Sequence, residues 1–321
     1  MTHTLVPPTL DDIRAARERI RGVAARTPLL KLHAPEFAGE LWLKLENLQP
    51  IGSFKLRGAA NAMKLAPRAA IERGVVTASA GNMAQGVAWC AREFGVPCRV
   101  LAPDHAPATK LAAIERLGGE VTRVPFDRWW QALAEHRAEG LDGLFIHPVS
   151  DPAVIAGNGT IGLEILDDLP ELDAVLVPYG GGGLSCGIAT AIKALSPRTK
   201  VFACEVETAA PFAAALAAGA PRAIDYTASF VDGIGGRGVL EEMWPLASRL
   251  LDGSIVVALE QIASAIRLLA ERQRVIAEGA GGASLAAALT GRAGTGRVVC
   301  VISGGNLDAA KLATILAGGV P

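Results

Sequence analysis

The sequence lacks the features that mark membrane, secreted and nucleic-acid-binding proteins. In its 321 residues no apolar run reaches the ~18 residues that a membrane-spanning helix needs. The formal net charge is -1 with both signs mixed along the chain, so we expect no basic surface for nucleic acid. The first eight residues, MTHTLVPP, show no basic start or apolar stretch of a signal peptide. We therefore expect a cytoplasmic protein that contacts neither membrane nor nucleic acid.

Cysteine and histidine are scarce and scattered. The five cysteines lie in apolar segments and their number is odd, which indicates buried free thiols rather than disulfides. Neither they nor the five histidines have the close spacing of zinc ligands, and no nucleophile elbow is present. His147 precedes Pro148 at an expected domain junction, where we favour a structural or solvated side chain over a catalytic one.

The chain does have a regular alternation of strand and helix patterns. Strands are predicted over 29–33, 41–45, 74–78, 98–102, 121–124, 174–178, 200–205 and 298–302. Helices are predicted over 9–21, 82–94, 107–117, 160–166, 184–195, 209–217, 259–276, 283–289 and from the turn at 303–306 to 316, the first of them capped by Thr9 and Asp12. This alternation predicts an α/β protein with parallel sheets. Ligands would then bind at the carboxyl ends of the strands.

Four polar or glycine-rich turns follow predicted strands. They are the turns at 50–55, 79–86, 180–183 and 303–306. Ser53 stands where a helix N-cap belongs, so Lys55 lies in the first turn of a helix. The positive end of the helix dipole disfavours a cation there and lowers the ammonium pKa. From this turn alone, Lys55 is either solvated or held as a neutral amine or imine.

The four glycines Gly180, Gly181, Gly182 and Gly183 lie between a strand and a helix. Successive backbone N–H groups at a helix start suit a phosphate. A rival interpretation is a dinucleotide site, in which Gly181, Gly183 and Gly187 precede Glu205 at a strand end. The spacing is one residue too long for that fingerprint.

Two further turns have both a structural and a functional interpretation. Ser303 and Asn306 are placed to cap the last helix, although the glycines between them suggest that a ligand approaches closely. Glu278 lies among glycines and apolar residues. It is either a buried, proton-active carboxyl group or a cap for the helix that follows.

Taken together, these motifs resemble the fold-type II pyridoxal-phosphate enzymes, in particular the threonine/serine dehydratases and their serine racemase and phenylserine dehydratase relatives. The segments KLENLQP (44–50) and GSFKLRGA (52–59), SAGN (79–82), GGGGL (180–184) and SGGN (303–306) match the family's motifs in order and spacing. The resemblance implies a tryptophan synthase β-like fold. It also implies a large cofactor-binding domain, residues 1–74 plus 148–321, and a small domain, residues 75–147.

The resemblance also implies roles for single residues. Lys55 would hold pyridoxal 5'-phosphate as an imine and act as the base at the substrate Cα. Phe54 would lie against the pyridine ring, and Asn82 and Ser303 would bond its hydroxyl group and its nitrogen. The remaining cofactor contacts would come from Gly180–Gly183, Leu184 and Glu278, and the substrate contacts from Ser79, Ala80, Gly81, Asn82 and Met83. A serine at the pyridine nitrogen makes the ring a weaker electron sink, which favours direct β-elimination over transamination.

Some residues depart from the family pattern. Met83, Asn158 and Tyr179 stand where His, Gln and a small apolar residue are usual. Met83 suggests a larger or more apolar β-substituent, and is equally compatible with threonine. Ala80 replaces the serine with which serine racemases move a proton, so racemisation is not expected.

The cation site of the relatives also looks incomplete. Glu205 and the carbonyl of Ala209 are present, but Pro211 replaces the expected carboxylate. We predict no metal, and a cation bound by Glu205 and Ala209 is the alternative.

The resulting hypothesis is an ammonia-lyase that dehydrates and deaminates L-threonine or L-serine, acting as a homodimer or homotetramer. Phenylserine and 3-hydroxyaspartate dehydratases and serine racemase are alternatives within the family. A dinucleotide-binding oxidoreductase and a non-catalytic binding module are alternatives outside it.

Overall fold

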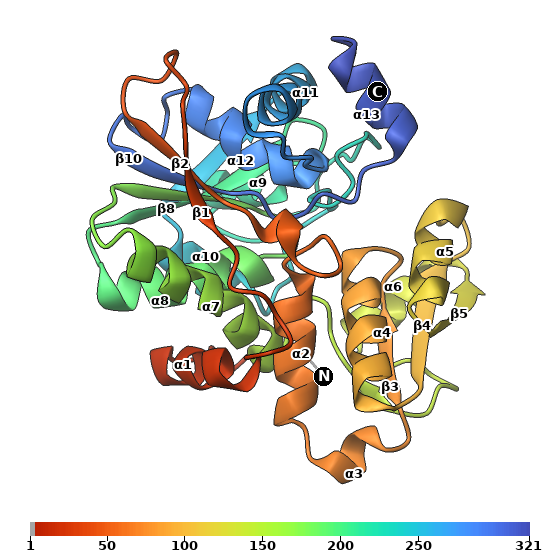
Figure 1. Cartoon of the computed structure of the whole chain (residues 1–321). Coiled ribbons are helices and arrows are strands. Elements are labelled where there is room, and N and C mark those ends of the chain that lie inside the picture. Colours follow the sequence, from red (N-terminus) through yellow and green to blue (C-terminus); the bar gives the residue numbers. More distant parts are fainter. Residues whose placement is uncertain (1–3) are drawn as a thin grey trace.

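A computed structural model describes residues 4–321 as an α/β structure with two separate sheets (Figure 1). His3 and the start of the N-terminal segment that was compared with a signal peptide lie outside the described residues. The larger sheet has the order β1 (Leu29–Leu32), β2 (Glu40–Lys44), β10 (Arg297–Val301), β7 (Ala174–Pro178), β8 (Lys200–Val206) and β9 (Gly253–Val257). The smaller has the order β5 (Gly119–Val124), β4 (Cys98–Pro103), β3 (Val75–Ala78) and β6 (Leu144–Phe145).

The parallel character predicted for both sheets is confirmed. Only β1 and β2 pair antiparallel, and all other pairings between the described strands are parallel. Apolar runs such as β7 are buried on both faces, as expected when helices cover both sides of a parallel sheet. The described residues contain no helix that is long and apolar enough to cross a membrane.

Thirteen α-helices are found among the described residues. They are α1 (Leu10–Arg19), α2 (Lys55–Leu65), α3 (Arg68–Ile71), α4 (Asn82–Phe94), α5 (Ala108–Arg116), α6 (Phe126–Ala134), α7 (Pro152–Asp168), α8 (Gly183–Leu195), α9 (Pro211–Ala218), α10 (Trp244–Leu250), α11 (Leu259–Leu268), α12 (Gly279–Leu289) and α13 (Ala309–Leu316). The predicted capping box of Thr9 and Asp12 is confirmed at α1. Helices α3, α6 and α10 and strands β6 and β9 were not predicted, and none of the five exceeds nine residues.

Several helix starts differ from the prediction. Helix α7 begins eight residues early, because Asp151 accepts hydrogen bonds from the amides of Ala153 and Val154. Helix α13 begins at Ala309, so neither Ser303 nor Asn306 caps it. The cap of α7 was not predicted, and the N-cap position of α13 belongs to Asp308 in place of the residues we expected.

The start of α2 also differs from the prediction. Phe54 occupies the N-cap position in place of Ser53. The Ser53 hydroxyl still accepts a long hydrogen bond of 3.4 Å from the Lys55 amide.

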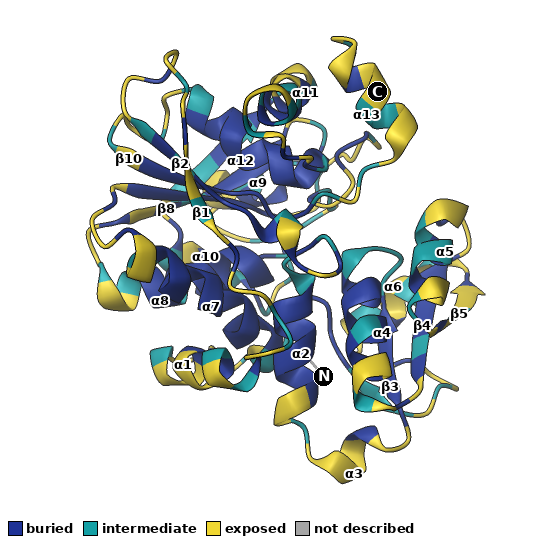
Figure 2. Cartoon of the chain, in the orientation of Figure 1, coloured by how far each residue is buried: buried dark blue, intermediate teal, exposed yellow. Residues whose placement is uncertain are grey.

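Helix α2 lies between the two sheets and packs against both α7 and α4 (Figure 1). Figure 2 shows that α7 and α8 are buried along most of their length. Their close approach depends on glycine, since a Cβ on Gly187 would lie 2.4 Å from the carbonyl oxygen of Ile155. Part of the glycine content that we attributed to ligand binding therefore serves helix packing.

Candidate active site

Lys55 opens α2 and points its amine at a backbone carbonyl. Its Nζ donates a 2.8 Å hydrogen bond to the oxygen of Pro148 and lies 5.2 Å from the centre of the Phe54 ring. Desolvation by the surrounding protein lowers the pKa of this amine to about 8, and the negative charge of Glu278 offsets only part of the effect. We predicted a lowered pKa from the helix dipole, whereas its cause in the structure is burial.

The lysine turn and the last glycine turn are joined through their backbones. The Phe54 amide donates to the Ser303 carbonyl over 3.0 Å, and the Gly305 amide donates to the Gly52 carbonyl over 2.9 Å. Ser303 is almost fully buried at this junction. Two motifs about 250 residues apart in the sequence therefore form one wall of a site.

Asn82, at the start of α4, is fixed on both sides of its amide. Its Nδ2 donates to Glu278 over 2.9 Å, and its Oδ1 accepts from Asn306 Nδ2 over 2.8 Å. Glu278 occupies the N-cap position of α12 without a side-chain capping bond, so it does not cap this helix as we considered. Burial, with a further contribution from Asp232, raises the pKa of Glu278 to about 7.

The glycine run packs against the segment that holds Lys55. It connects β7 with α8, and Gly182 has a φ of +95°, which favours glycine. A Cβ on Gly181 would lie 2.6 Å from the side chain of Val149, and one on Gly183 would lie 2.8 Å from its carbonyl oxygen. Within the described part of the chain, no acceptor is found for the amides of these four glycines.

Comparison with known proteins decides the family. Residues 20–304 match the model of the pyridoxal-phosphate dependent enzymes. An L-threonine ammonia-lyase from Thermotoga maritima is 40% identical over 317 residues, covering 97% of this chain and 79% of its own. The chain belongs to the pyridoxal-phosphate dependent enzyme family.

Two solved structures agree with this assignment. The structure of maize serine racemase superimposes with a TM-score of 0.89 at 31% identity, covering 96% of each chain. That of a threonine deaminase from T.th. gives 0.87 at 36% identity, covering 94% of this chain and 99% of that one. The predicted fold-type II architecture, family and cofactor are confirmed, and the oxidoreductase alternative is wrong.

The site's own geometry fits the family's cofactor. The aldehyde of pyridoxal phosphate needs a neutral amine to react with, and the pKa of the Lys55 amine is lowered to about 8. The phosphate of the cofactor needs hydrogen-bond donors, and the amides of Gly180–Gly183 at the start of α8 have no acceptor among the described residues. Tyr179 adds an orphaned group, because its buried hydroxyl has no hydrogen-bond partner among the described residues. This hydroxyl lies 3.1 Å from the position of a Cβ on Gly182.

The predicted substrate turn lies at the start of α4. The Gly81 amide donates to the Ser79 hydroxyl over 3.2 Å, and a Cβ on Gly81 would meet no atom within 4 Å, so this side of the turn is open. Ala80 is partly buried against the neighbouring apolar cluster. Met83 is 1% exposed and packs in the same cluster. This packing gives Met83 a place in the core and does not support its predicted place in the substrate pocket.

Glu205 belongs to a helix cap in this structure. Its two oxygens accept hydrogen bonds of 2.8 Å from the amides of Phe212 and Ala213, and Oε2 also accepts from Ser254. These donors engage the carboxylate that we considered as a cation ligand together with Ala209, and as the acidic residue of a dinucleotide site. In the described part of the chain no group of three acidic, histidine or cysteine side chains is arranged to hold a metal ion.

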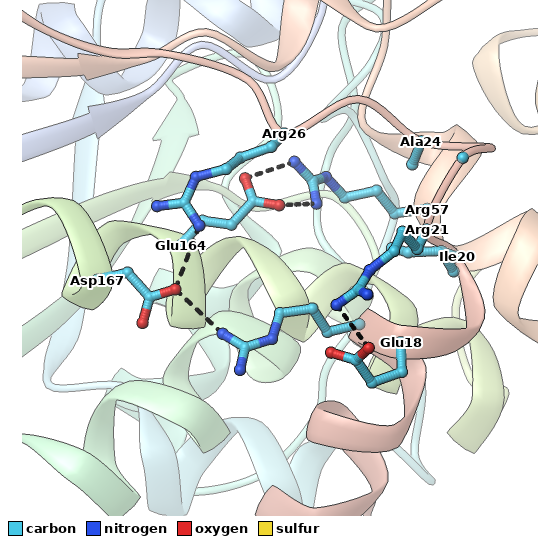
Figure 3. A pocket seen from close by; sticks show the side chains of 10 residues that line it. Glu18, Ile20, Arg21, Ala24, Arg26, Arg57, Glu164 and Asp167 are labelled. Atoms are coloured by element: carbon cyan, nitrogen blue, oxygen red, sulfur yellow. Dashed lines mark hydrogen bonds and ion pairs between the residues drawn. The ribbon is translucent and has the colours of Figure 1, made fainter.

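A buried cluster of charges behind the lysine turn was not predicted as such. Arg57 is 1% exposed and pairs with Glu46 and Glu164, and Lys44 donates to Glu164 over 2.6 Å. Arg57 and Glu164 also line a neighbouring pocket with a volume of about 480 Å³. Figure 3 shows the ion pair between these two side chains. Arg57 is already paired there, so we assign the pocket no part in catalysis.

The segment from His147 to Ser150 was not predicted to belong to the site. It supplies the carbonyl group that holds Lys55 and the side chain that packs under the glycine run. A sequence does not reveal which backbone carbonyl will face a side chain. The His147-Pro148 pair was the only feature of the sequence that could have pointed to this segment.

Proposed function

We propose that this protein is a pyridoxal-phosphate dependent ammonia-lyase that converts L-threonine or L-serine to a 2-oxo acid and ammonia. The observation that carries the proposal is the Lys55 amine, bonded to the Pro148 carbonyl, next to Val149, which packs against a glycine run whose amides lack acceptors among the described residues. The names of the relatives from Thermotoga maritima and T.th. support threonine as the first substrate.

Each motif has a part in holding the cofactor. Gly180–Gly183 and Leu184 would hold its phosphate, and Phe54 would lie against its ring. Asn82, Glu278 and Ser303 would hold the polar edge of the ring, and the bonds that Asn82 makes to Glu278 and Asn306 keep its amide in one orientation. When bound, the cofactor supplies an electron-withdrawing ring that makes the substrate Cα–H bond acidic.

Lys55 is suited to remove the proton from Cα. An amine with a pKa of about 8 is partly neutral at physiological pH and gains a stable charge when it accepts a proton. Ser79, Gly81 and Asn82, at the start of the 13-residue helix α4, are suited to the substrate carboxylate, since helix N-termini attract anions.

The proposal is tested with the purified chain and its Lys55→Ala variant. We expect a visible absorbance band near ~410 nm in the wild type that is absent from the variant, because only a lysine amine forms the covalent link. Ammonia and 2-oxo acid release are then measured with threonine, serine, phenylserine and 3-hydroxyaspartate, each as both enantiomers. A wild-type protein that binds the cofactor without releasing ammonia from any of them would be a non-catalytic module.

The same panel separates the alternatives within the family. The likeness to maize serine racemase favours racemisation as a second candidate, whereas the methyl group of Ala80 cannot carry a proton. Rapid interconversion of D- and L-serine would overturn this argument. The division into residues 1–74 plus 148–321 and residues 75–147, the cytoplasmic location and the homodimer or homotetramer remain predictions.

A further inference from the structure

The side chain of His147 lies beside the site without being one of its motifs. It is 2% exposed, and its Nδ1 accepts hydrogen bonds from the amides of Val149 over 3.1 Å and Ser150 over 2.8 Å. Two N–H donors require a lone pair on Nδ1, so the ring is neutral with its hydrogen on Nε2. These two hydrogen bonds therefore hold Pro148, Val149 and Ser150 in a turn around the His147 ring.

A second histidine and a carboxylate hold this ring and turn. His136 stacks on His147 with ring centres 4.1 Å apart and an angle of 12° between the planes. The Nε2 of His136 lies 3.2 Å from the Ser150 hydroxyl, which donates to Glu242 over 2.9 Å. His136 has a φ of +54°, rare for a residue other than glycine. The group therefore joins the stretch after α6, the His147 segment and the stretch before α10.

The turn that His147 holds contacts two parts of the site. Pro148 offers its carbonyl oxygen to the Lys55 amine at 2.8 Å. Val149 fills the space under Gly181 and Gly183 so closely that neither position has room for a Cβ. A shift of this turn would displace the acceptor for Lys55 and the support of the glycine run together.

We propose that His147 is a positioning residue, which acts through the turn of Pro148, Val149 and Ser150 to place the Lys55 amine beside the glycine run. The inference rests on the proposed function, because it concerns the same lysine and the same glycine run.

The proposal is tested on the full chain, freed of cofactor, with a pair of substitutions at one position. His147→Asn keeps an acceptor oxygen near the place of Nδ1, whereas His147→Leu keeps similar bulk without an acceptor. His105→Leu makes the latter change at an exposed turn and serves as control. Two quantities are measured: hydrogen exchange of the Val149 and Ser150 amides, and the rate at which pyridoxal phosphate forms the visible band of Lys55.

We expect His147→Leu to speed exchange of the two amides about tenfold, as loss of a hydrogen bond of ordinary strength predicts. It should slow band formation by a similar factor, while His147→Asn and His105→Leu remain close to wild type. Unchanged exchange in His147→Leu would overturn the proposal, and so would faster exchange with an unchanged rate of band formation.

A misfolded His147→Leu variant and a wild type that forms no visible band are distinguished from the outcomes above. If His147→Leu does not fold, His147→Gln replaces it, because its longer side chain carries the amide to the place of Nε2 and leaves Nδ1 without a substitute. If the wild type forms no band, the proposed function fails, and the exchange measurement still decides whether His147 holds the turn.

Discussion

The amide of Asn82 donates a 2.9 Å hydrogen bond to the carboxyl group of Glu278, 196 positions further along the chain. This bond joins the start of α4, beside the smaller sheet, to the start of α12, beside the larger sheet. Glu278 is partly buried and its pKa is raised. Its partner, the side-chain amide of Asn82, is the group that we propose to hydrogen-bond the cofactor ring.

This carboxyl group predicts a pH dependence of stability. Its pKa in the folded chain is about 7, above the ordinary value of 4.5, so the folded state binds more protons than the unfolded state between these values. Its contribution is fully present below about pH 4.5 and is lost as the pH rises to about 7. We expect the free energy of unfolding of wild type relative to Glu278→Gln to fall by up to about 3 kcal/mol over this range. Urea unfolding of both proteins at several pH values measures it, and a constant difference would contradict the raised pKa.

Lys55 predicts a pH dependence of cofactor capture. Only the neutral amine attacks an aldehyde, and burial lowers the pKa of this amine to about 8. We expect the rate at which the cofactor-free chain forms the visible band to rise with pH, with a midpoint near 8. Stopped-flow absorbance measures it. A midpoint near 10.5, the ordinary value for lysine, would show that Lys55 is solvated.

The hydrogen bonds of Glu205 lead us to expect that removing metal ions changes neither activity nor stability. Two amides and the hydroxyl of Ser254 engage its oxygens, so we expect chelators to leave both activity and melting temperature unchanged. The substitution Glu205→Ala would leave the buried donors without an acceptor and lower the free energy of unfolding by about 1–3 kcal/mol. Denaturant unfolding checks this against Glu241→Ala, an exposed control. Activity lost to a chelator and restored by a cation would show that an ion binds.

We expect that removing the hydroxyl group of Tyr179 stabilises the folded protein. Its ring stacks on Phe212 with centres 4.7 Å apart, while its hydroxyl is buried without a partner among the described residues. In the cofactor-free chain, Tyr179→Phe keeps the ring and should raise the free energy of unfolding by about 1 kcal/mol, because no buried donor is left unpaired. Thermal and urea unfolding measure it, and a loss of stability would show that the hydroxyl has a partner.

Much of the fold was predictable because the relevant signals are local. Strand β7 and helix α4 were predicted with the bounds that the structure gives them, since an apolar run and a helix closed by glycine define them within a few residues. The short elements β6 and α10 were missed, because two to seven residues are too few for a periodic pattern. The start of α7 was placed too late because the Asp151-Pro152 cap was not recognised.

The sequence by itself determined the motifs, their order and the family, because these depend on residue types at fixed spacings. It supplied Lys55, the glycine run, Asn82 and Ser303 as candidates. The tertiary structure decided what surrounds them: the Pro148 carbonyl at Lys55, the partners of Asn82, and the helix cap that engages Glu205. Those contacts involve backbone groups and side chains up to about 220 residues apart, whose hydrogen-bond partners and burial depend on how the chain folds.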